Sequence, residues 1–371
     1  MSTFYKVFLS FFLFIAINSF SYCQIGLSHD AKVSILTCDK GNELYSLFGH
    51  TAIRIQDPSN SLDIVYNYGT FDFNTENFYL KFIKGDLQYF VTVNSFNEFY
   101  YQYTIENRSI WEQNLLLSPS QKQQLFDKLN KSLQSDEKFY TYKFIDRNCT
   151  NMVVDKVNQT LGTNCVVKTT EKGKTYREIL FPYLDNHFYE NLGINIIFGE
   201  KVDRDGEKLF LPSQFMESLK TATYNGKPLA ERSITLLKAT IENPSASLWN
   251  NFYSLILVLC LIVVTRKIWV YISFLGIFGL LGLFLSLVGF YSYHEEVALN
   301  YNVLLFNPLL LLLIFFYLKK KANWVKKIAI FNLVSLGIIT IILLNKPNLI
   351  MFSPLILCSG YMHYFILKKS T

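Results

Sequence analysis

Two short motifs, about a hundred residues apart, carry the side chains best suited to chemistry. The first is GHTAIRIQD, in which His50 follows a glycine and precedes a strand-like run. The second is DRNCTN, in which Cys149 stands where a helical pattern begins. A thiol attacks as its thiolate, and a neighbouring imidazole can take up the proton and return it later. We therefore expect His50 and Cys149 to meet in the fold.

The position of Cys149 at a helix start favours acyl-transfer chemistry. The positive end of the helix dipole lowers a thiol pKa, and the first backbone N–H groups can hold an oxyanion. The thiolate would attack an ester or amide carbonyl, and an acceptor would then displace the thioester. Asn148 is a candidate for substrate contact, or it is only the helix N-cap. The alternative for the pair is a small core cysteine and a structural histidine.

A predicted β-hairpin over residues 50–69 positions the histidine. TAIRI alternates like a half-buried strand, DPSNS has turn chemistry, and LDIVYNYG supplies the return strand. A turn centred on Pro58 and Ser59 would place His50 across from Asn67 or its neighbour. Asn67 is therefore our candidate to orient the ring. Asp63 is the alternative, because a one-residue slip in register changes the face of a strand.

Arg54 lies four residues after His50, on the same side of the predicted strand. We consider it a candidate for binding a phosphate or carboxylate of the substrate. The alternative is an ion pair with an internal acid, such as Asp63 or Asp146.

The remaining soluble segment alternates strand and helix patterns. Residues 31–38 are strand-like, and Ser118 with Pro119 marks a helix start. Residues 139–146 are strand-like and lead into a helix that runs from Cys149 to a stop at Gly162. Residues 166–245 form an extension whose role the pattern does not define.

The composition divides the chain into three parts. Residues 1–23 carry Lys6 and the apolar run VFLSFFLFIAI, which predicts a signal peptide. Tyr22 before Cys23 argues against lipidation there. Residues 24–245 are polar enough for a globular domain. Residues 246–371 are almost continuously apolar, and we expect five transmembrane helices, near 248–265, 268–290, 302–318, 328–344 and 348–366.

The charges between the predicted spans give the orientation. Lysine and arginine gather after the first, third and fifth spans, and positive loops belong in the cytoplasm. The soluble domain then lies outside the membrane, as the signal peptide also predicts, and the C-terminus is cytoplasmic. The net charge of +6 is partly due to these loops, so we expect no nucleic-acid partner.

One outer loop, HEEVALNYNVLLFNPL, is unusually polar for the edge of a membrane. Polar groups at the edge of the hydrocarbon are costly unless they have partners or water. His294 and Asn302 are therefore candidates to line a cleft that faces the soluble domain and to help hold a substrate. The alternative is an ordinary interfacial loop.

Cysteine usage does not indicate a metal or another cofactor, because no CxxC pair or Cys/His cluster is present. Cys260 and Cys358 fall inside predicted spans and are expected to be packing residues. In an exported domain, Cys38 and Cys165 could pair with each other, or either could trap Cys149.

GHTAIRIQD, the following NYGTFDF, and DRNCTN together resemble the Lnb N-terminal periplasmic domain family. The resemblance covers roughly residues 30–165, and the multi-span tail in outline. It implies an α+β fold of the permuted papain-like (NlpC) type, followed by an all-α transmembrane bundle. It also implies a bacterial inner-membrane protein with Cys149 as nucleophile and His50 as base. Some relatives have a second histidine on the return strand, where this chain offers only Asn67 or Asp63.

The family includes a lipoprotein N-acyltransferase, so the resemblance implies a cysteine acyltransferase that acts on lipoprotein N-termini. The partner would be a membrane lipid or lipoprotein. Two alternatives remain, because one fold hosts several functions. One is a cell-envelope cysteine peptidase or amidase. The other is a non-catalytic envelope-assembly or binding protein.

Overall fold

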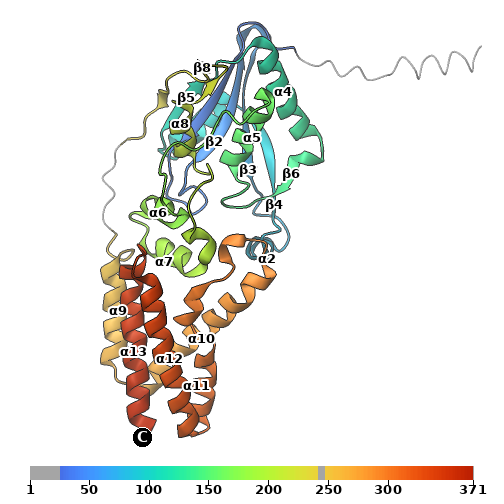
Figure 1. The fold of residues 1–371 in the computed structure, drawn as a ribbon. Coiled ribbons are helices and arrows are strands. Elements are labelled where there is room, and N and C mark those ends of the chain that lie inside the picture. The colour runs from blue at the N-terminus through green and yellow to red at the C-terminus, as the bar shows by residue number, and fades with distance from the viewer. Residues whose placement is uncertain (1–25, 241–246, 371) are drawn as a thin grey trace, which may run out of the picture.

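An antiparallel sheet of seven strands is the frame of the N-terminal half of the computed structural model, which describes residues 26–240 and 247–370. The predicted signal peptide and Cys23 lie outside these residues. The strand order is β6-β4-β3-β2-β1-β5-β9 (Figure 1). The strands are β1 (Lys32–Cys38), β2 (His50–Asp57), β3 (Leu62–Thr70), β4 (Gln88–Ser95), β5 (Ile110–Asn114), β6 (Phe139–Thr141) and β9 (Ile234–Leu237).

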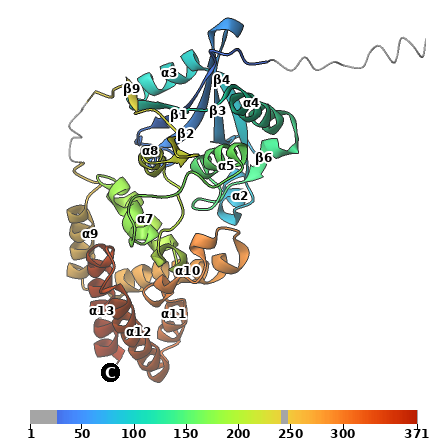
Figure 2. The same cartoon turned by 45° about the horizontal axis from the view of Figure 1, so that its top comes forward.

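Helices cover both faces of the sheet, because alternate residues of its central strands point to opposite sides. Helices α4 (Pro119–Gln134) and α5 (Cys149–Leu161) pack on the face that carries Ile53 and Tyr66. Helix α3 (Phe96–Ile105) covers the other face, over Ala52. Figure 2 shows α3 on one side of the sheet and α4 with α5 on the other. The soluble part is therefore an α+β domain, as predicted.

The hairpin prediction is confirmed, with one difference in register. Strands β2 and β3 pair in antiparallel fashion, but Asn67 lies opposite Ala52 rather than opposite His50. The connection holds a 3-10 turn, η1 (Pro58–Asn60), followed by Ser61 in the left-handed conformation. These residues move the centre of the turn along the chain, so Asn67 is a diagonal neighbour of His50.

The two predicted helix starts are also confirmed. Ser118 caps α4 through a reciprocal hydrogen-bond pair with Gln121. Asn148 caps α5 in the same way, and Gly162 ends that helix in the left-handed conformation. The strand expected over 139–146 is shorter, because the chain leaves the sheet and forms a tight turn, in which Lys143 bridges to Arg147.

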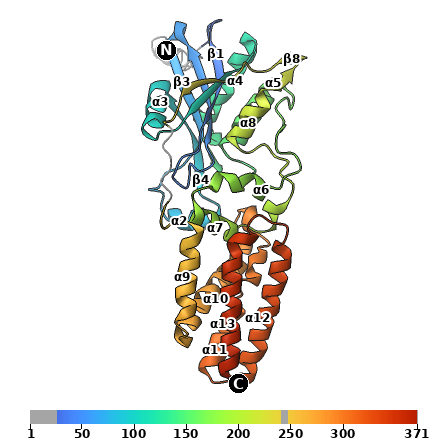
Figure 3. The same ribbon diagram turned by 90° about the vertical axis from the view of Figure 1, so that its left-hand side faces the viewer.

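The poorly defined segment after residue 163 lies largely between the sheet and the membrane region. Helices α6 (Tyr176–Leu180) and α7 (Phe188–Ile197) occupy this junction, while α8 (Pro212–Leu219) packs beside β1 and α5 (Figure 3). The other short elements are η2 (Asp136–Lys138), η3 (Phe181–Leu184), η4 (Glu200–Asp203), β7 (Thr223–Tyr224) and β8 (Lys227–Pro228).

The C-terminal region is a helical bundle with four segments long and apolar enough to cross a membrane. They are α10 (Ile268–Tyr291), the broken segment Glu295–Leu318, α12 (Ala322–Leu343) and α13 (Leu349–Ser370). The broken segment contains η5 (Glu295–Val297), η6 (Tyr301–Leu304) and α11 (Leu309–Leu318).

The first of the five predicted spans corresponds to a shorter helix. Helix α9 (Phe252–Val264) has 13 residues. At about 1.5 Å per residue it is about 20 Å long, against roughly 30 Å of hydrocarbon. A fifth crossing therefore stays a prediction.

The cysteines of the soluble domain do not form the disulfide that the sequence left open. Cys38 is buried in β1 and Cys165 follows α5, and both thiols are free. Burial raises the pKa of the Cys38 thiol to about 12, although Tyr103 bonds it and Arg108 lies near. Cys38 is therefore a packing residue in the part of the core beneath α3.

Candidate active site

Cys149 is the first residue of α5, as the sequence predicts. The preceding Asn148 is buried and anchors this helix start from three directions. Its side chain accepts the N–H of Asn151 at 3.0 Å and donates to the carbonyls of Phe144 and Phe210, both at 2.8 Å. Asn148 is therefore the helix cap, and its polar atoms are used internally rather than offered to a substrate.

Several groups around the Cys149 sulfur favour the thiolate. Burial by itself raises the pKa of this thiol, but the charge and hydrogen bonding of His50 lower it. The backbone N–H of Thr51 and the side chain of Thr150 contribute in the same direction. The net result is a Cys149 pKa below the ordinary thiol value, which favours the thiolate form.

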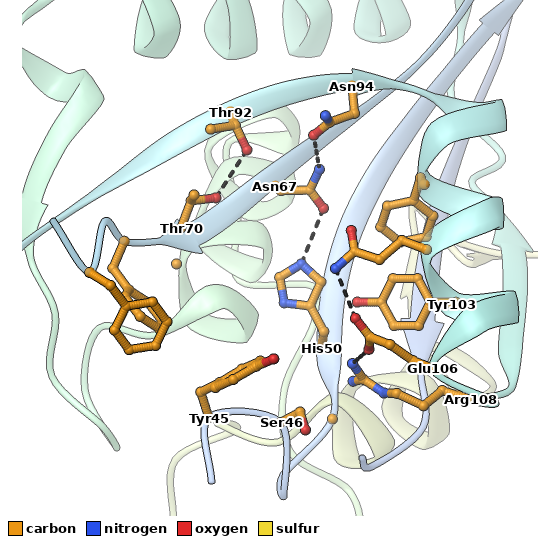
Figure 4. A pocket seen from close by; sticks show the side chains of 16 residues that line it. Tyr45, Ser46, His50, Asn67, Thr70, Thr92, Asn94, Tyr103, Glu106 and Arg108 are labelled. Carbon is orange, nitrogen blue, oxygen red and sulfur yellow. Dashed lines mark hydrogen bonds and ion pairs between the residues drawn. The ribbon is translucent and has the colours of Figure 1, made fainter. Parts of the chain in front are cut away.

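A chain of amides orients the His50 ring (Figure 4). His50 Nε2 lies 3.2 Å from Oδ1 of Asn67, and Asn67 Nδ2 donates to Oδ1 of Asn94 at 3.3 Å and to the Val65 carbonyl at 3.4 Å. Because Asn67 uses its amino group for Asn94, its oxygen faces the ring and accepts the Nε2–H. The other ring nitrogen, Nδ1, is then left as the basic one.

The backbone of Gly69, near the end of β3, lies against Cys149. Gly69 has a φ of +91°, a conformation that L side chains rarely adopt. A β-carbon on Gly69 would lie 3.5 Å from the Cys149 β-carbon and 4.0 Å from its backbone nitrogen. The pairing of β3 with β4 also shifts between Asn67 and Thr70. Next to this irregularity, α5 packs against the central strands β2 and β3.

His50 and Asn67 line an open cavity of about 340 Å³. Three of its aromatic residues, Tyr45, Phe71 and Phe73, contact one another, and three of its polar residues, Gln102, Glu106 and Arg108, are joined by hydrogen bonds. The full lining is Tyr45, Ser46, Gly49, His50, Asn67, Gly69, Thr70, Phe71, Phe73, Thr92, Asn94, Phe99, Gln102, Tyr103, Glu106 and Arg108. A substrate with both an apolar chain and polar groups would find matching surfaces here.

Arg54 does not belong to this cavity. Its guanidinium makes two bonds to Asp63, both at 2.7 Å, and one to Glu112 at 3.1 Å. The same group stacks on Phe96 at 3.4 Å. Of the roles considered for Arg54, the structure therefore gives the internal ion pair. It also removes Asp63 as the residue that orients His50, which leaves Asn67.

His294 and Asn302 contact the soluble domain but not the His50 cavity. His294 Nε2 lies 2.8 Å from the Phe82 carbonyl at the end of α2 (Phe78–Lys84). Asn302 is fully buried and donates to the carbonyls of Asn195 and Ile196 at the end of α7, at 2.9 and 3.0 Å. Both residues therefore dock the outer loop onto the domain, and neither lines the predicted substrate cleft.

Sequence reasoning missed several residues that shape the site. Asn94 and Thr51 lie on strands where only alternation was visible, and alternation does not reveal which polar residue faces an imidazole. Gly69 had a usable signal, because a glycine at the end of a strand indicates a close approach of backbones. Glu296, buried beside the loop that precedes Cys149, gave no signal beyond its place in the polar outer loop.

Two family matches cover most of the chain. Residues 27–180 match the Lnb N-terminal periplasmic domain, and residues 239–370 match the Lnb transmembrane domain. No curated protein and no solved structure matches the chain.

Proposed function

Because the chain belongs to the Lnb family, we propose that it is a membrane-bound cysteine acyltransferase of the bacterial cell envelope. Its acyl acceptor would be the N-terminal amine of a lipoprotein. In this proposal the periplasmic domain has the permuted papain-like (NlpC-type) fold. The membrane region lies in the inner membrane with the C-terminus in the cytoplasm, because its lysine-rich loops belong there.

The first half of the proposed reaction loads the cysteine. The Cys149 thiolate attacks the carbonyl carbon of a lipid ester, and the resulting oxyanion is held by backbone N–H groups at the start of α5. The C–O bond then breaks as the C–S bond of the thioester remains. The departing alkoxide takes the proton that His50 received from the thiol, and a lysolipid leaves.

The second half transfers the acyl chain to an amine. The amine nitrogen attacks the thioester carbon, a C–N bond forms, and the C–S bond breaks. His50 accepts the proton lost by the amine, so the thiolate is regenerated. The Asn67 oxygen keeps the Nε2–H of His50 in place throughout, which leaves Nδ1 for these proton transfers.

The observation that supports this proposal is that His50 lies near enough to Cys149 to lower its pKa, in a domain joined to a membrane region. The outer loop of that region bonds the segment that leads to the cysteine, since Glu296 accepts the N–H of Ile145 at 3.3 Å. A soluble hydrolase with a simple anchor would need no such contact. In an enzyme that takes its substrate from the bilayer, this contact would hold the thiol at a fixed distance from the lipid.

Mass spectrometry of lipoprotein N-termini tests the proposal. Cells whose only copy carries Cys149→Ala should lose the acyl pattern that the wild-type protein produces. Cys165→Ala is the matched control, because this thiol is partly exposed and lies outside the site. An acyl pattern that is unchanged in Cys149→Ala would contradict the proposal.

Two outcomes of related assays would redirect the assignment. Release of peptide fragments from peptidoglycan by the full-length protein, dependent on Cys149, would indicate a peptidase or amidase. If Cys149 fails to react with an acyl-mimicking thiol probe in the folded protein, the site is a binding surface rather than a catalytic one.

A further inference from the structure

Helix α2 is a short helix without a buried residue. Four of its seven residues are large, apolar and exposed to at least two fifths of their surface: Tyr79, Leu80, Phe82 and Ile83. Phe73, in the loop before the helix, is 60% exposed. An apolar cluster of this kind on a water-facing surface is unfavourable and marks a site of contact with another apolar phase.

Hydrogen bonds hold the end of α2 at the outer end of a membrane span. Ser292 Oγ donates to the Ile83 carbonyl at 2.7 Å, and the Tyr293 N–H donates to the Lys84 carbonyl at 2.7 Å. Both donors follow directly after α10, whose last residues are exposed to the surroundings of the bundle. The end of α2 is therefore bonded to the segment that directly follows α10, whose last two residues, Phe290 and Tyr291, are also exposed.

Aromatic contacts lead from α2 to the His50 cavity. The ring of Phe78 in α2 lies 5.1 Å from Phe73, Phe73 lies 4.9 Å from Phe71, and Phe71 lies 6.1 Å from Tyr45. Phe73, Phe71 and Tyr45 all line the cavity. A continuous row of aromatic rings thus runs from α2 to the His50 cavity.

We propose that the exposed face of α2 and Phe73 lies in the outer interface of the bilayer and forms the entrance through which an acyl chain reaches Cys149. Tyrosine, phenylalanine and lysine are the residues that favour the interfacial layer. Lys81 stands among the apolar residues of α2, and a lysine in this position can reach the phosphate layer while its stem stays among the acyl chains. The part of this proposal that concerns Cys149 rests on the proposed function; the membrane contact of α2 does not.

Photo-crosslinking tests the membrane contact without any catalysis. Leu80 is replaced by p-benzoylphenylalanine in the full-length protein, which is reconstituted in phospholipid vesicles and irradiated. We expect phospholipid acyl chains attached at position 80, detected by mass spectrometry of the proteolytic peptide. The matched control is Tyr101, which is 67% exposed on α3, away from the bundle (Figure 2). Equal labelling at both positions, or none at position 80, would overturn the membrane contact.

A second pair of variants tests the entrance. Leu80→Glu and Ile83→Glu should lower acyl transfer from a long-chain phospholipid in vesicles at least tenfold. Thioester formation with a water-soluble short-chain ester should stay within twofold of wild type, which also shows that the variants are folded. Ile105→Glu on α3 is the control and should leave both rates unchanged. If the α2 variants lose the same share of activity with both acyl donors, α2 is not the entrance. If the wild-type protein forms no thioester with either donor, the proposed function is wrong instead.

Discussion

The side chain of Glu296 accepts a hydrogen bond at 3.3 Å from the backbone N–H of Ile145, four residues before Cys149. Glu296 belongs to the outer loop of the membrane region, and it is 1% exposed. Lys201 lies 3.8 Å away and also binds Asp146. The membrane region therefore helps to hold the loop that precedes Cys149, in addition to anchoring the domain.

Glu296→Ala is predicted to lower the stability of the junction. It leaves the buried Ile145 N–H without its partner, which costs about 1–3 kcal/mol. We expect a lower midpoint of thermal unfolding in detergent and slower labelling of Cys149 by an acyl-mimicking thiol probe, because the loop before α5 loses its support.

Glu295→Ala is the matched control for that experiment. Glu295 is the adjacent residue, and its carboxylate bonds Lys143 and Lys201 at 2.9 and 3.0 Å, but its side chain is 56% exposed. Exposed ion pairs contribute at most about 1 kcal/mol. An equal loss of stability in both variants would contradict a specific role for the buried bond to Ile145.

Asn67→Ala is predicted to slow the chemistry and to leave folding largely intact. His50 would lose the acceptor of its Nε2–H and would rotate away from the productive orientation. We expect kcat to fall about 10- to 100-fold with little change in KM, because part of the roughly 10²–10⁴-fold contribution of a general base depends on its orientation. Asn67→Asp keeps an acceptor and should recover part of kcat. If Asn67→Ala keeps full activity, Asn67 does not position the ring.

The pH dependence of Cys149 alkylation reports on its pairing with His50. The pKa of this thiol lies below its ordinary value, so the thiolate persists as pH falls until that lowered pKa is crossed. In His50→Ala the burial that raises the pKa remains, while the largest lowering effect is lost. The midpoint of iodoacetamide reactivity should therefore move to higher pH. A midpoint unchanged by the mutation would show that His50 does not stabilise the thiolate.

Arg54 is predicted to contribute to the stability of the fold rather than to substrate binding. Arg54→Met leaves the acids Asp63 and Glu112 facing each other without a cation. Breaking a buried ion pair lowers the free energy of unfolding. Since Asp63 is 37% exposed, we expect a decrease near the lower end of the range for such pairs, about 3 kcal/mol. Arg204→Met, a break in an exposed pair, should change stability by less than about 1 kcal/mol. Retained kcat and KM in the folded fraction of Arg54→Met would confirm the structural role.

Local sequence signals predicted most of what lies near the site. The helix that begins at Cys149 followed from its cap, its apolar spacing and Gly162, because these features act within a few residues. The β2–β3 hairpin followed from its alternation and turn residues. The exact register did not, since a 3-10 turn and the left-handed Ser61 moved Asn67 away from the position opposite His50.

Long-range placement could not be predicted in the same way. Arg54 and His294 had plausible roles at the site, but the structure uses both for internal contacts. Their partners lie on elements whose packing the sequence does not specify. The segment after residue 163 was undefined because its helices α6 and α7 are short and bond the outer loop, through Arg177 to Tyr301 and through Asn195 to Asn302.

The sequence by itself determined the two halves of the protein, the apolar character of the second half, and the pair of motifs that hold His50 and Cys149. Each depends on composition or on residues that are neighbours in the chain. Only the tertiary structure decided that Asn67 rather than Asp63 faces the histidine, that Glu296 bonds the loop before the cysteine, and that the end of α2 bonds the segment after α10. These relationships join residues far apart in sequence, and side-chain packing and charge burial select them only once the whole chain has folded.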